Sequence, residues 1–286
     1  MAQSSLHISH WGTYDAQVTD GKITAVTPYA GDPDPHPIIE NIVAAQQHPA
    51  RIDRPYIRRG WLTGGPGATT DRGDDAFVPV DWDEALDLLA GDLKRIYRDH
   101  GGEAIYGGSY GWASAGRFHH AQSQLKRLLS CAGGYTQSVN NYSFGASGPF
   151  LPHVIATLAQ WESKASTWRS IAQNADLVVA IGGLARKNSA IANGGAVRHD
   201  LMSWLRTCRD NGIDILNISP LRDDVHHDVM SEWIPIKPAT DGALLQAIAN
   251  TLIEESLYDK EFIANYTVGF DLFSQSLKDK TPAWAA

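Results

Sequence analysis

The sequence predicts an α/β protein in which an irregular, β-rich N-terminal lead-in precedes an open, mainly parallel sheet with helices on both faces. Turn-forming residues and short alternating stretches dominate residues 1–80. Over residues 81–286, apolar strand-like runs alternate with helical patterns. Strands separated by helices at this spacing favour a parallel sheet, because each parallel connection needs a crossover. We therefore expect a domain boundary near residue 80.

The first predicted elements are short strands, followed by one long helix. Lys22–Thr27 alternates apolar and polar residues as a half-buried strand does, whereas Gly31–Pro37 and Gly64–Gly67 concentrate turn formers. A helical pattern runs through Asp83–Tyr97, where apolar residues recur on one face. Either Asp81 or Asp83 is suited to cap its N-terminus.

Strands and helices then alternate to the end of the chain. The predicted strands are Ala104–Tyr106, Leu177–Ile181 and Ile213–Ile218, and the predicted helices cover approximately residues 117–129, 196–210 and 241–258. In an open α/β sheet, ligands bind beyond the carboxyl ends of the strands. The loops that begin at Gly182 and Ser219 occupy this position, so we expect them to contact a ligand.

Composition excludes several classes of protein. The chain has 286 residues, of which 43% are hydrophobic and 20% charged, as in ordinary globular proteins. A net charge of -8 argues against a nucleic-acid partner. Two distant cysteines, Cys131 and Cys208, build neither a disulfide framework nor an iron-sulfur cluster. The glycine fingerprint of nicotinamide enzymes and the phosphate loop of nucleotide triphosphatases are both missing, which disfavours an α/β dehydrogenase and a triphosphatase.

The N-terminal residues carry no recognisable targeting signal. Met1–His10 has no basic stretch followed by an apolar one, and no run of about 18 apolar residues occurs in the sequence. We expect neither a signal peptide nor a membrane span, and a cytoplasmic location.

Three segments carry the most functional information: Gly107–Gly116, Ala132–Tyr135 and Asn141–Ala146. They combine many glycines, an aromatic pair and a lone serine. Together they resemble the molybdenum oxidoreductases of the dimethyl sulfoxide reductase family, in the branch of the trimethylamine N-oxide and biotin sulfoxide reductases, and the resemblance extends over nearly the whole chain. It implies an incomplete molybdopterin oxidoreductase fold, with residues 81–286 as a pterin-dinucleotide-binding region truncated at its C-terminus.

The resemblance assigns catalytic roles to Tyr110, Trp112 and Ser143, with Ser143 as the metal ligand and Trp112 also contacting the cofactor. A serine alkoxide is a hard donor that suits a high-valent metal. The Tyr110 hydroxyl is placed to hydrogen-bond the oxygen of an S-oxide or N-oxide. Without the resemblance, Ser143 is as readily a turn or helix cap, and Tyr110 and Trp112 are core aromatics two residues apart on one face of a strand.

The implied cofactor is molybdenum held by bis(molybdopterin guanine dinucleotide), without an iron-sulfur cluster. Basic side chains neutralise a pyrophosphate, and an aspartate accepts hydrogen bonds from guanine or ribose. Surface charges explain the same residues equally well. The candidate cofactor-binding residues in the three loops concerned are Gly183, Arg186, Lys187, Ser219, Pro220, Arg222 and Asp241.

The function implied by the resemblance is oxygen-atom transfer from an S-oxide or N-oxide, such as biotin sulfoxide, methionine sulfoxide, dimethyl sulfoxide or trimethylamine N-oxide. An external electron donor and a maturation chaperone are the expected partners. Family members are much longer, so the chain resembles an N-terminal fragment, and catalysis by it alone is not expected. The alternative is a truncated, non-catalytic remnant or a split half of such an enzyme.

Two histidine pairs, His119-His120 and His226-His227, raise the question of a further metal site. Asp228 follows the second pair directly. Adjacent side chains on an extended segment point to opposite faces and do not chelate one ion easily. We therefore expect solvated or hydrogen-bonded histidines at both places.

Overall fold

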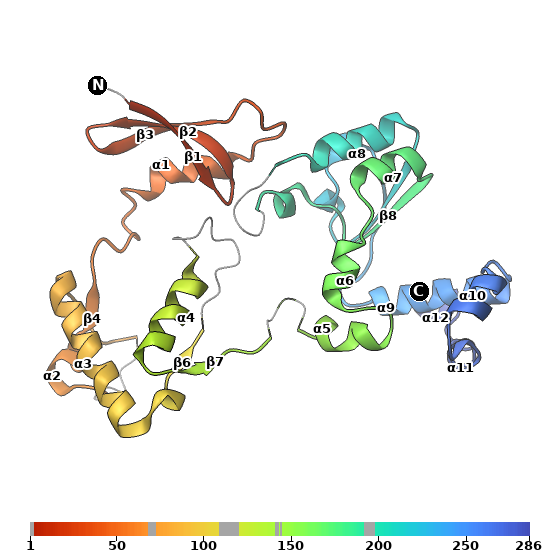
Figure 1. Cartoon of the computed structure of the whole chain (residues 1–286). Helices are drawn as coiled ribbons and strands as arrows, with labels where there is room; N and C mark the ends of the chain where they lie inside the picture. Colours follow the sequence, from red (N-terminus) through yellow and green to blue (C-terminus); the bar gives the residue numbers. More distant parts are fainter. Residues whose placement is uncertain (1–2, 68–72, 109–119, 141–142, 144, 192–197) are drawn as a thin grey trace. The chain divides into compact units, whose positions relative to one another are not determined.

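The computed structural model describes residues 3–67, 73–108, 120–140, 143, 145–191 and 198–286 (Figure 1). Its contacts divide the chain into two compact units, residues 1–165 with 189–200, and residues 166–188 with 201–286. The predicted α/β class is confirmed by this mixture of sheets and helices. At residue 80 the local structure does change, because strand β5 (Phe77–Pro79) ends and helix α3 (Trp82–His100) begins. A domain boundary at that point stays a prediction.

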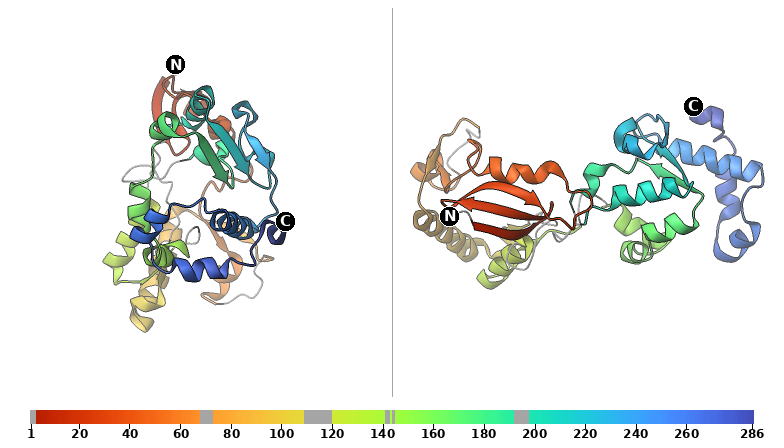
Figure 2. Two further views of the ribbon diagram at one scale, coloured as in Figure 1. Left: turned by 90° about the vertical axis from the view of Figure 1, so that its right-hand side faces the viewer. Right: turned by 90° about the horizontal axis from the view of Figure 1, so that it is seen from above.

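The first unit starts with an antiparallel meander of β1 (Gln3–Ser9), β2 (Gly12–Thr19) and β3 (Lys22–Pro28). Two-residue turns join the strands, since Ser9 pairs with Gly12 and Thr19 with Lys22. The short helices η1 (Pro37–Glu40) and α1 (Asn41–Ala45) follow, and Figure 2 shows α1 beside the sheet. The core between them contains Tyr14, Ala16 and Ile39.

A buried contact between His199 and Asp32 holds the segment around His199 close to this meander. The Nδ1 atom of His199 lies 2.6 Å from Oδ2 of Asp32, and its Nε2 atom lies 3.1 Å from the carbonyl oxygen of Ala190. Gly12 packs directly against the ring, because a Cβ atom there would lie 3.0 Å from Cε1 of His199. Both ring nitrogens of His199 therefore face an oxygen acceptor inside the first unit.

The remainder of the first unit is built from short strands and helices. Helix α3 begins after Asp81, whose carboxylate accepts a hydrogen bond of 2.9 Å from the amide of Glu84, so the first of the two predicted caps is confirmed. The predicted strand at residue 104 starts later, because residues 102–104 form a 3-10 turn. The elements are β4 (Tyr56–Arg58), α2 (Arg59–Gly64), β5, α3, η2 (Gly102–Ala104), β6 (Tyr106–Gly107), α4 (Ala121–Ala132), β7 (Thr136–Gln137), α5 (Ser147–Phe150), η3 (Leu151–His153) and α6 (Leu158–Ser163).

The second unit contains a parallel sheet with strand order β10-β9-β8. The apolar run Leu177–Ile181 forms β8 as predicted, and β9 covers Asp214–Ile218. Strand β10 (Glu232–Ile234) was not predicted, since three residues are too few for an alternating pattern to be recognised. The other elements are α7 (Trp168–Asn174), η4 (Arg186–Ser189), α8 (Leu201–Asp210), η5 (Arg222–Asp224), η6 (His227–Val229), α9 (Asp241–Glu254), α10 (Lys260–Tyr266), α11 (Phe270–Ser276) and α12 (Pro282–Ala285).

One face of this sheet carries the core of the second unit. Helices α7 and α8 lie side by side (Figure 1) and pack on this face. The side chains of Leu177, Val179 and Ile181 on the other face of β8 are 53%, 46% and 46% exposed. The buried residues of the core are Ala172, Ala180, Met202, Leu205, Cys208, Ile213, Ile215, Val225 and Val229. None of the helices in the described ranges is long and apolar enough to span a bilayer.

The two cysteines are both free thiols, but their surroundings differ. Cys131 is exposed on α4, whereas Cys208 is fully buried in the core on α8. Burial raises the pKa of the Cys208 thiol, because the thiolate loses its hydration. We expect a thiol reagent to label one cysteine per native chain and both in denaturant, as counted by mass spectrometry. Rapid labelling of Cys208 in the native chain would contradict the packing of α8.

Candidate functional site

The segments that carry Tyr110, Trp112 and Ser143 leave the same edge of a small parallel sheet. Strands β6 and β7 are parallel, with Gly107 opposite Gln137, so their carboxyl ends lie together. The chain that continues from β6 leads to residues 109–119; Tyr110 and Trp112 lie there, outside the described residues. The chain that continues from β7 leads to Ser143. Both segments therefore begin at the same edge of this small sheet.

Gly107 fixes this small sheet against helix α4. A Cβ atom at Gly107 would overlap the ring of Tyr135 and the Cδ1 atom of Leu129, so only glycine fits. The Tyr97 hydroxyl on α3 donates a hydrogen bond of 2.9 Å to the carbonyl oxygen of Gly134. The glycines that the sequence singled out here therefore allow close packing under the candidate site.

Ser143 lies in a loop closed by a neighbouring side chain. Asn140 adopts a left-handed conformation with φ of +70°, and its amide Nδ2 donates a hydrogen bond of 3.0 Å to the carbonyl oxygen of Gly145. Ser143, between these two residues, is exposed. It does not cap α5, whose N-cap is Ala146. Its role as metal ligand stays a prediction.

The candidate cofactor-binding residues of the second unit gather at the carboxyl edge of its sheet. Ile181 pairs with Ile218, and Ile218 with Ile234, so the three strands end together. The loops 182–187, 219–224 and 235–240 follow β8, β9 and β10, and Asp241 begins α9 directly after the third loop. This arrangement brings together Gly183, Arg186, Lys187, Ser219, Pro220, Arg222 and Asp241 at one edge, as expected from the sequence; their contacts with a cofactor stay predictions.

Asp224 joins the first two of these loops, although the sequence analysis did not assign it a role there. Its Oδ2 atom accepts a hydrogen bond of 2.5 Å from the Ser219 hydroxyl, and its carbonyl oxygen accepts one of 2.7 Å from the amide of Leu184. The Nζ atom of Lys187 lies 3.8 Å from Oδ1. The only signal in the sequence is an aspartate five residues after Ser219, and such a spacing is common in loops.

Ser219 supports the loop from inside. The residue is fully buried, and its hydroxyl also accepts a hydrogen bond of 3.3 Å from the amide of Leu221. Its carbonyl oxygen accepts a hydrogen bond of 2.8 Å from the indole nitrogen of Trp233. The Ser219 side chain therefore shapes the loop, whereas Pro220 beside it is exposed and accessible to a ligand.

Two consecutive glycines make the turn at the end of β8. Gly182 and Gly183 have φ values of +84° and +83°, a region that other residues rarely adopt. A Cβ atom on Gly183 would overlap Cβ of Asp224 and lie 2.8 Å from its carbonyl oxygen, whereas nothing lies within 4 Å of one on Gly182. Gly183 is therefore needed for the close approach of two loops, and Gly182 for its backbone conformation alone.

The edge of the sheet is suited to a negatively charged group. Arg186 and Lys187 come from the loop after β8 and Arg222 from the loop after β9. The side chain of Lys187 is 69% exposed, so its ion pair with Asp224 leaves the ammonium group accessible. Cationic side chains beside flexible glycine backbone are a favourable setting for a diphosphate.

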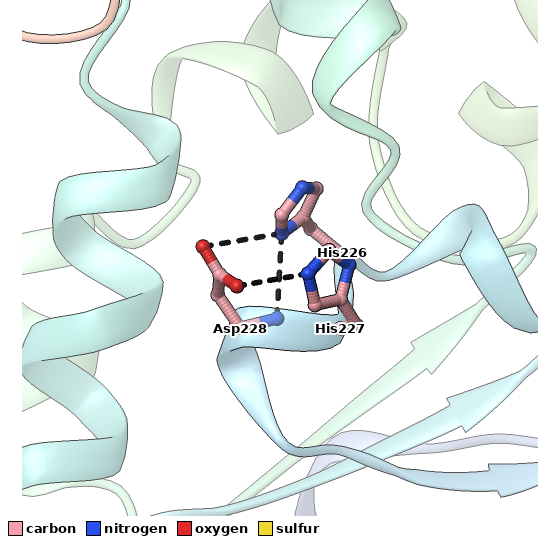
Figure 3. A group of neighbouring side chains, drawn as sticks. All are labelled: His226, His227 and Asp228. Carbon is pink, nitrogen blue, oxygen red and sulfur yellow. Dashed lines mark hydrogen bonds and ion pairs between the residues drawn. The ribbon is translucent and has the colours of Figure 1, made fainter.

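The described histidines of the two pairs are hydrogen-bonded or exposed, as expected, but the reason given for the second pair does not hold. His226 caps the 3-10 turn η6, and the rings of His226 and His227 stack with centroids 4.2 Å apart (Figure 3). The premise of an extended segment was wrong at this place, because the turn puts the two rings on the same side. His120 caps α4 by accepting a hydrogen bond of 3.2 Å from the amide of Ser123, and His119 lies outside the described residues.

Comparison with known families identifies two consecutive matches. The model of the molybdopterin oxidoreductase N-terminal domain matches residues 7–46, and that of molybdopterin oxidoreductase matches residues 51–280. Among solved structures, acetylene hydratase from Pelobacter acetylenicus is similar with a TM-score of 0.55 at 20% identity, over 99% of this chain and 36% of that one. This structural likeness concerns the fold alone.

Curated relatives are more similar in sequence. A dimethyl sulfoxide/trimethylamine N-oxide reductase from Rhodobacter capsulatus is 38% identical over 286 residues, which cover 97% of this chain and 34% of the relative. A biotin sulfoxide reductase from Cereibacter sphaeroides is 38% identical over 88% of this chain and 34% of its own. A trimethylamine-N-oxide reductase from Haemophilus influenzae is 34% identical over 97% of this chain. The chain thus spans about one third of the length of these relatives.

Proposed function

The chain belongs to the molybdopterin oxidoreductase family, and we propose that it forms the N-terminal, cofactor-holding part of a molybdenum reductase that removes oxygen from S-oxides or N-oxides. The observation that supports this proposal most directly is the common edge of the parallel sheet in the second unit. Loops from three strands meet there, and two of them supply basic side chains. The substrate class is inferred from the relatives, whose names specify dimethyl sulfoxide, trimethylamine N-oxide and biotin sulfoxide.

The residues present fit a pterin dinucleotide. Gly182 leaves open space above the first loop, since nothing lies within 4 Å of its would-be Cβ atom. Lys187 and Arg222 are exposed in the loops after β8 and β9 and would bind the diphosphate. The Oδ1 atom of Asn217, at the end of β9, is buried and lacks a hydrogen-bond partner among the described residues. Asp241, in the first turn of α9, would accept hydrogen bonds from guanine or ribose.

In this proposal, individual residues of the chain have different roles in holding the metal and binding the substrate. When bound, the molybdenum and its pterins would supply two electrons to the oxide and accept its oxygen atom. Ser143 would hold the metal through its oxygen, from an exposed loop that Asn140 and Gly145 close. Tyr110 would donate a hydrogen bond to the oxide oxygen and so stabilise charge that develops there, and Trp112 would bound the pocket. An external donor would return the electrons to this group.

The competing proposal is a chain that holds no cofactor, either as a remnant or as a half that needs its second part. Its support is the coverage of only about one third of the relatives. A dinucleotide of this size is normally buried on most sides, so one third of a reductase is expected to hold it weakly. We therefore assign catalysis to the longer protein and cofactor binding to this chain.

Metal analysis of the purified chain tests the proposal. We expect molybdenum, measured by elemental mass spectrometry, together with guanine nucleotide released on denaturation, when the chain is made in a host that synthesises the pterin dinucleotide. A host that lacks pterin synthesis is the control. If chain from the pterin-producing host contained neither molybdenum nor guanine nucleotide, the proposal that this chain binds the cofactor would be contradicted.

A further inference from the structure

His226, His227 and Asp228 present three ligand atoms to one point at the surface of the second unit (Figure 3). One ligand atom from each residue lies within 4.8 Å of the other two. Nε2 of His227 is 3.1 Å from Oδ1 of Asp228, and Nδ1 of His226 is 3.5 Å from Oδ2. In a tetrahedral zinc site with bonds of about 2.1 Å, neighbouring ligand atoms are about 3.4 Å apart. The two observed separations, each to a different oxygen of the Asp228 carboxylate, lie on either side of this value.

The backbone under these side chains is held in place. Val225 and Val229, which flank the three residues, are 2% and 1% exposed and belong to the core beside α8. Between them, η6 turns the chain, and Met230 ends it in a left-handed conformation with φ of +58°. A short turn fixed by a buried side chain at each end loses little conformational freedom when a ligand binds.

One ring nitrogen of His226 is turned toward Asp228. Its Nδ1 atom accepts a hydrogen bond of 3.3 Å from the amide of Asp228. Nδ1 is also the atom that faces the Asp228 carboxylate. Because this nitrogen has a single lone pair, a metal ion bound to it would replace the hydrogen bond from the Asp228 amide.

Two arginines on α8 oppose a bound cation. Nη2 of Arg206 lies 3.4 Å from Oδ2 of Asp228, and Nη1 of Arg209 donates a hydrogen bond of 2.8 Å to the Asp228 carbonyl oxygen. The Arg206 side chain is 43% exposed, so it can turn into solvent when an ion takes its place. Because Arg206 competes with a cation for the Asp228 carboxylate, a substitution of Arg206 should change the metal affinity of the site.

We propose that His226, His227 and Asp228 bind a divalent transition-metal ion of the zinc type, with water in the remaining position. Two imidazole nitrogens and one carboxylate oxygen form a donor set that suits Zn²⁺ and disfavours Ca²⁺, which takes six to eight oxygen ligands. The site is separate from the loops proposed for the pterin dinucleotide and does not depend on that function.

Calorimetric titration of the metal-free chain with Zn²⁺ tests the proposal. We expect one saturable site per chain, at least tenfold weaker in His227→Ala, because the loss of even an outer partner of a metal ligand costs tenfold or more. His227 is 81% exposed, so its replacement should not disturb the fold. Arg206→Gln should instead bind Zn²⁺ more tightly, which a purely structural role of the cluster would not produce.

The control variant is His48→Ala. His48 is exposed and its Nδ1 accepts a hydrogen bond of 3.1 Å from the amide of Ala50, so it matches His226 in local geometry without an adjacent acid. Zn²⁺ affinity should be unchanged in this variant, and Ca²⁺ should give no saturable binding to the unmodified chain. Equal Zn²⁺ affinity in His227→Ala and the unmodified chain, or no saturable Zn²⁺ binding at all, would overturn the proposal.

Discussion

Replacement of Gly183 by alanine is expected to destabilise the chain by on the order of 3 kcal/mol, through backbone strain and overpacking together. The residue has φ of +83°, and an added Cβ would overlap Asp224. Asp224 cannot move away freely, because it also holds Ser219 and Leu184. Urea unfolding, monitored by tryptophan fluorescence, measures the decrease in the free energy of unfolding.

Gly182→Ala is the matched control for this prediction. Gly182 has nearly the same φ, +84°, but open space around its would-be Cβ atom. Its replacement should cost only about 1 kcal/mol, the penalty for the left-handed backbone. The difference between the two variants then measures the contact between the loops after β8 and β9. Equal destabilisation would show that this contact has no energetic importance.

The same pair of variants also bears on the proposed function. Since Gly183 holds the two basic loops together, its replacement should lower the molybdenum and guanine nucleotide content of chain made in a pterin-producing host. Gly182→Ala, with its loops still joined through Asp224, should retain more of both. Elemental analysis of the two purified variants makes the comparison. Full cofactor content in Gly183→Ala would contradict the assignment of this edge to the cofactor.

Replacement of Ser143 by alanine is expected to lower oxide reduction by more than about 100-fold in a longer protein that contains this chain, since loss of a direct metal ligand should exceed the 10–100-fold effect of outer partners. The residue is exposed on a loop that the hydrogen bond from Asn140 to Gly145 closes. The fold should therefore survive the change. Steady-state turnover with dimethyl sulfoxide and trimethylamine N-oxide measures the effect.

Ser138→Ala is the control for the serine ligand. Ser138 is an exposed serine that directly follows β7, in the same stretch of chain as Ser143. Its replacement should leave turnover within a factor of about two, as expected of a surface change. Unchanged turnover in Ser143→Ala would remove Ser143 from the metal site, whereas loss in both variants would indicate a disturbed loop.

Local patterns in the sequence were sufficient for the long elements. The run Leu177–Ile181 is uniformly apolar and forms β8, and the cap at Asp81 with apolar residues on one face predicted α3. Each of these two signals consists of residues that lie close together along the chain. The short strands β6, β7 and β10 depend instead on partners far away in sequence, so their positions were missed or shifted.

The candidate site likewise combines features that the sequence predicts with features that only the folded chain creates. The sequence alone was sufficient for the family, through the segments near Gly107 and Ser143, and for the two strands whose following loops carry Arg186 and Arg222. The contacts of Asp224 with two of those loops, and the stacking of His226 and His227 beside Asp228, became evident only in the folded chain. The physical reason is that these contacts depend on strand register and on a turn held by buried valines, which no local periodicity encodes.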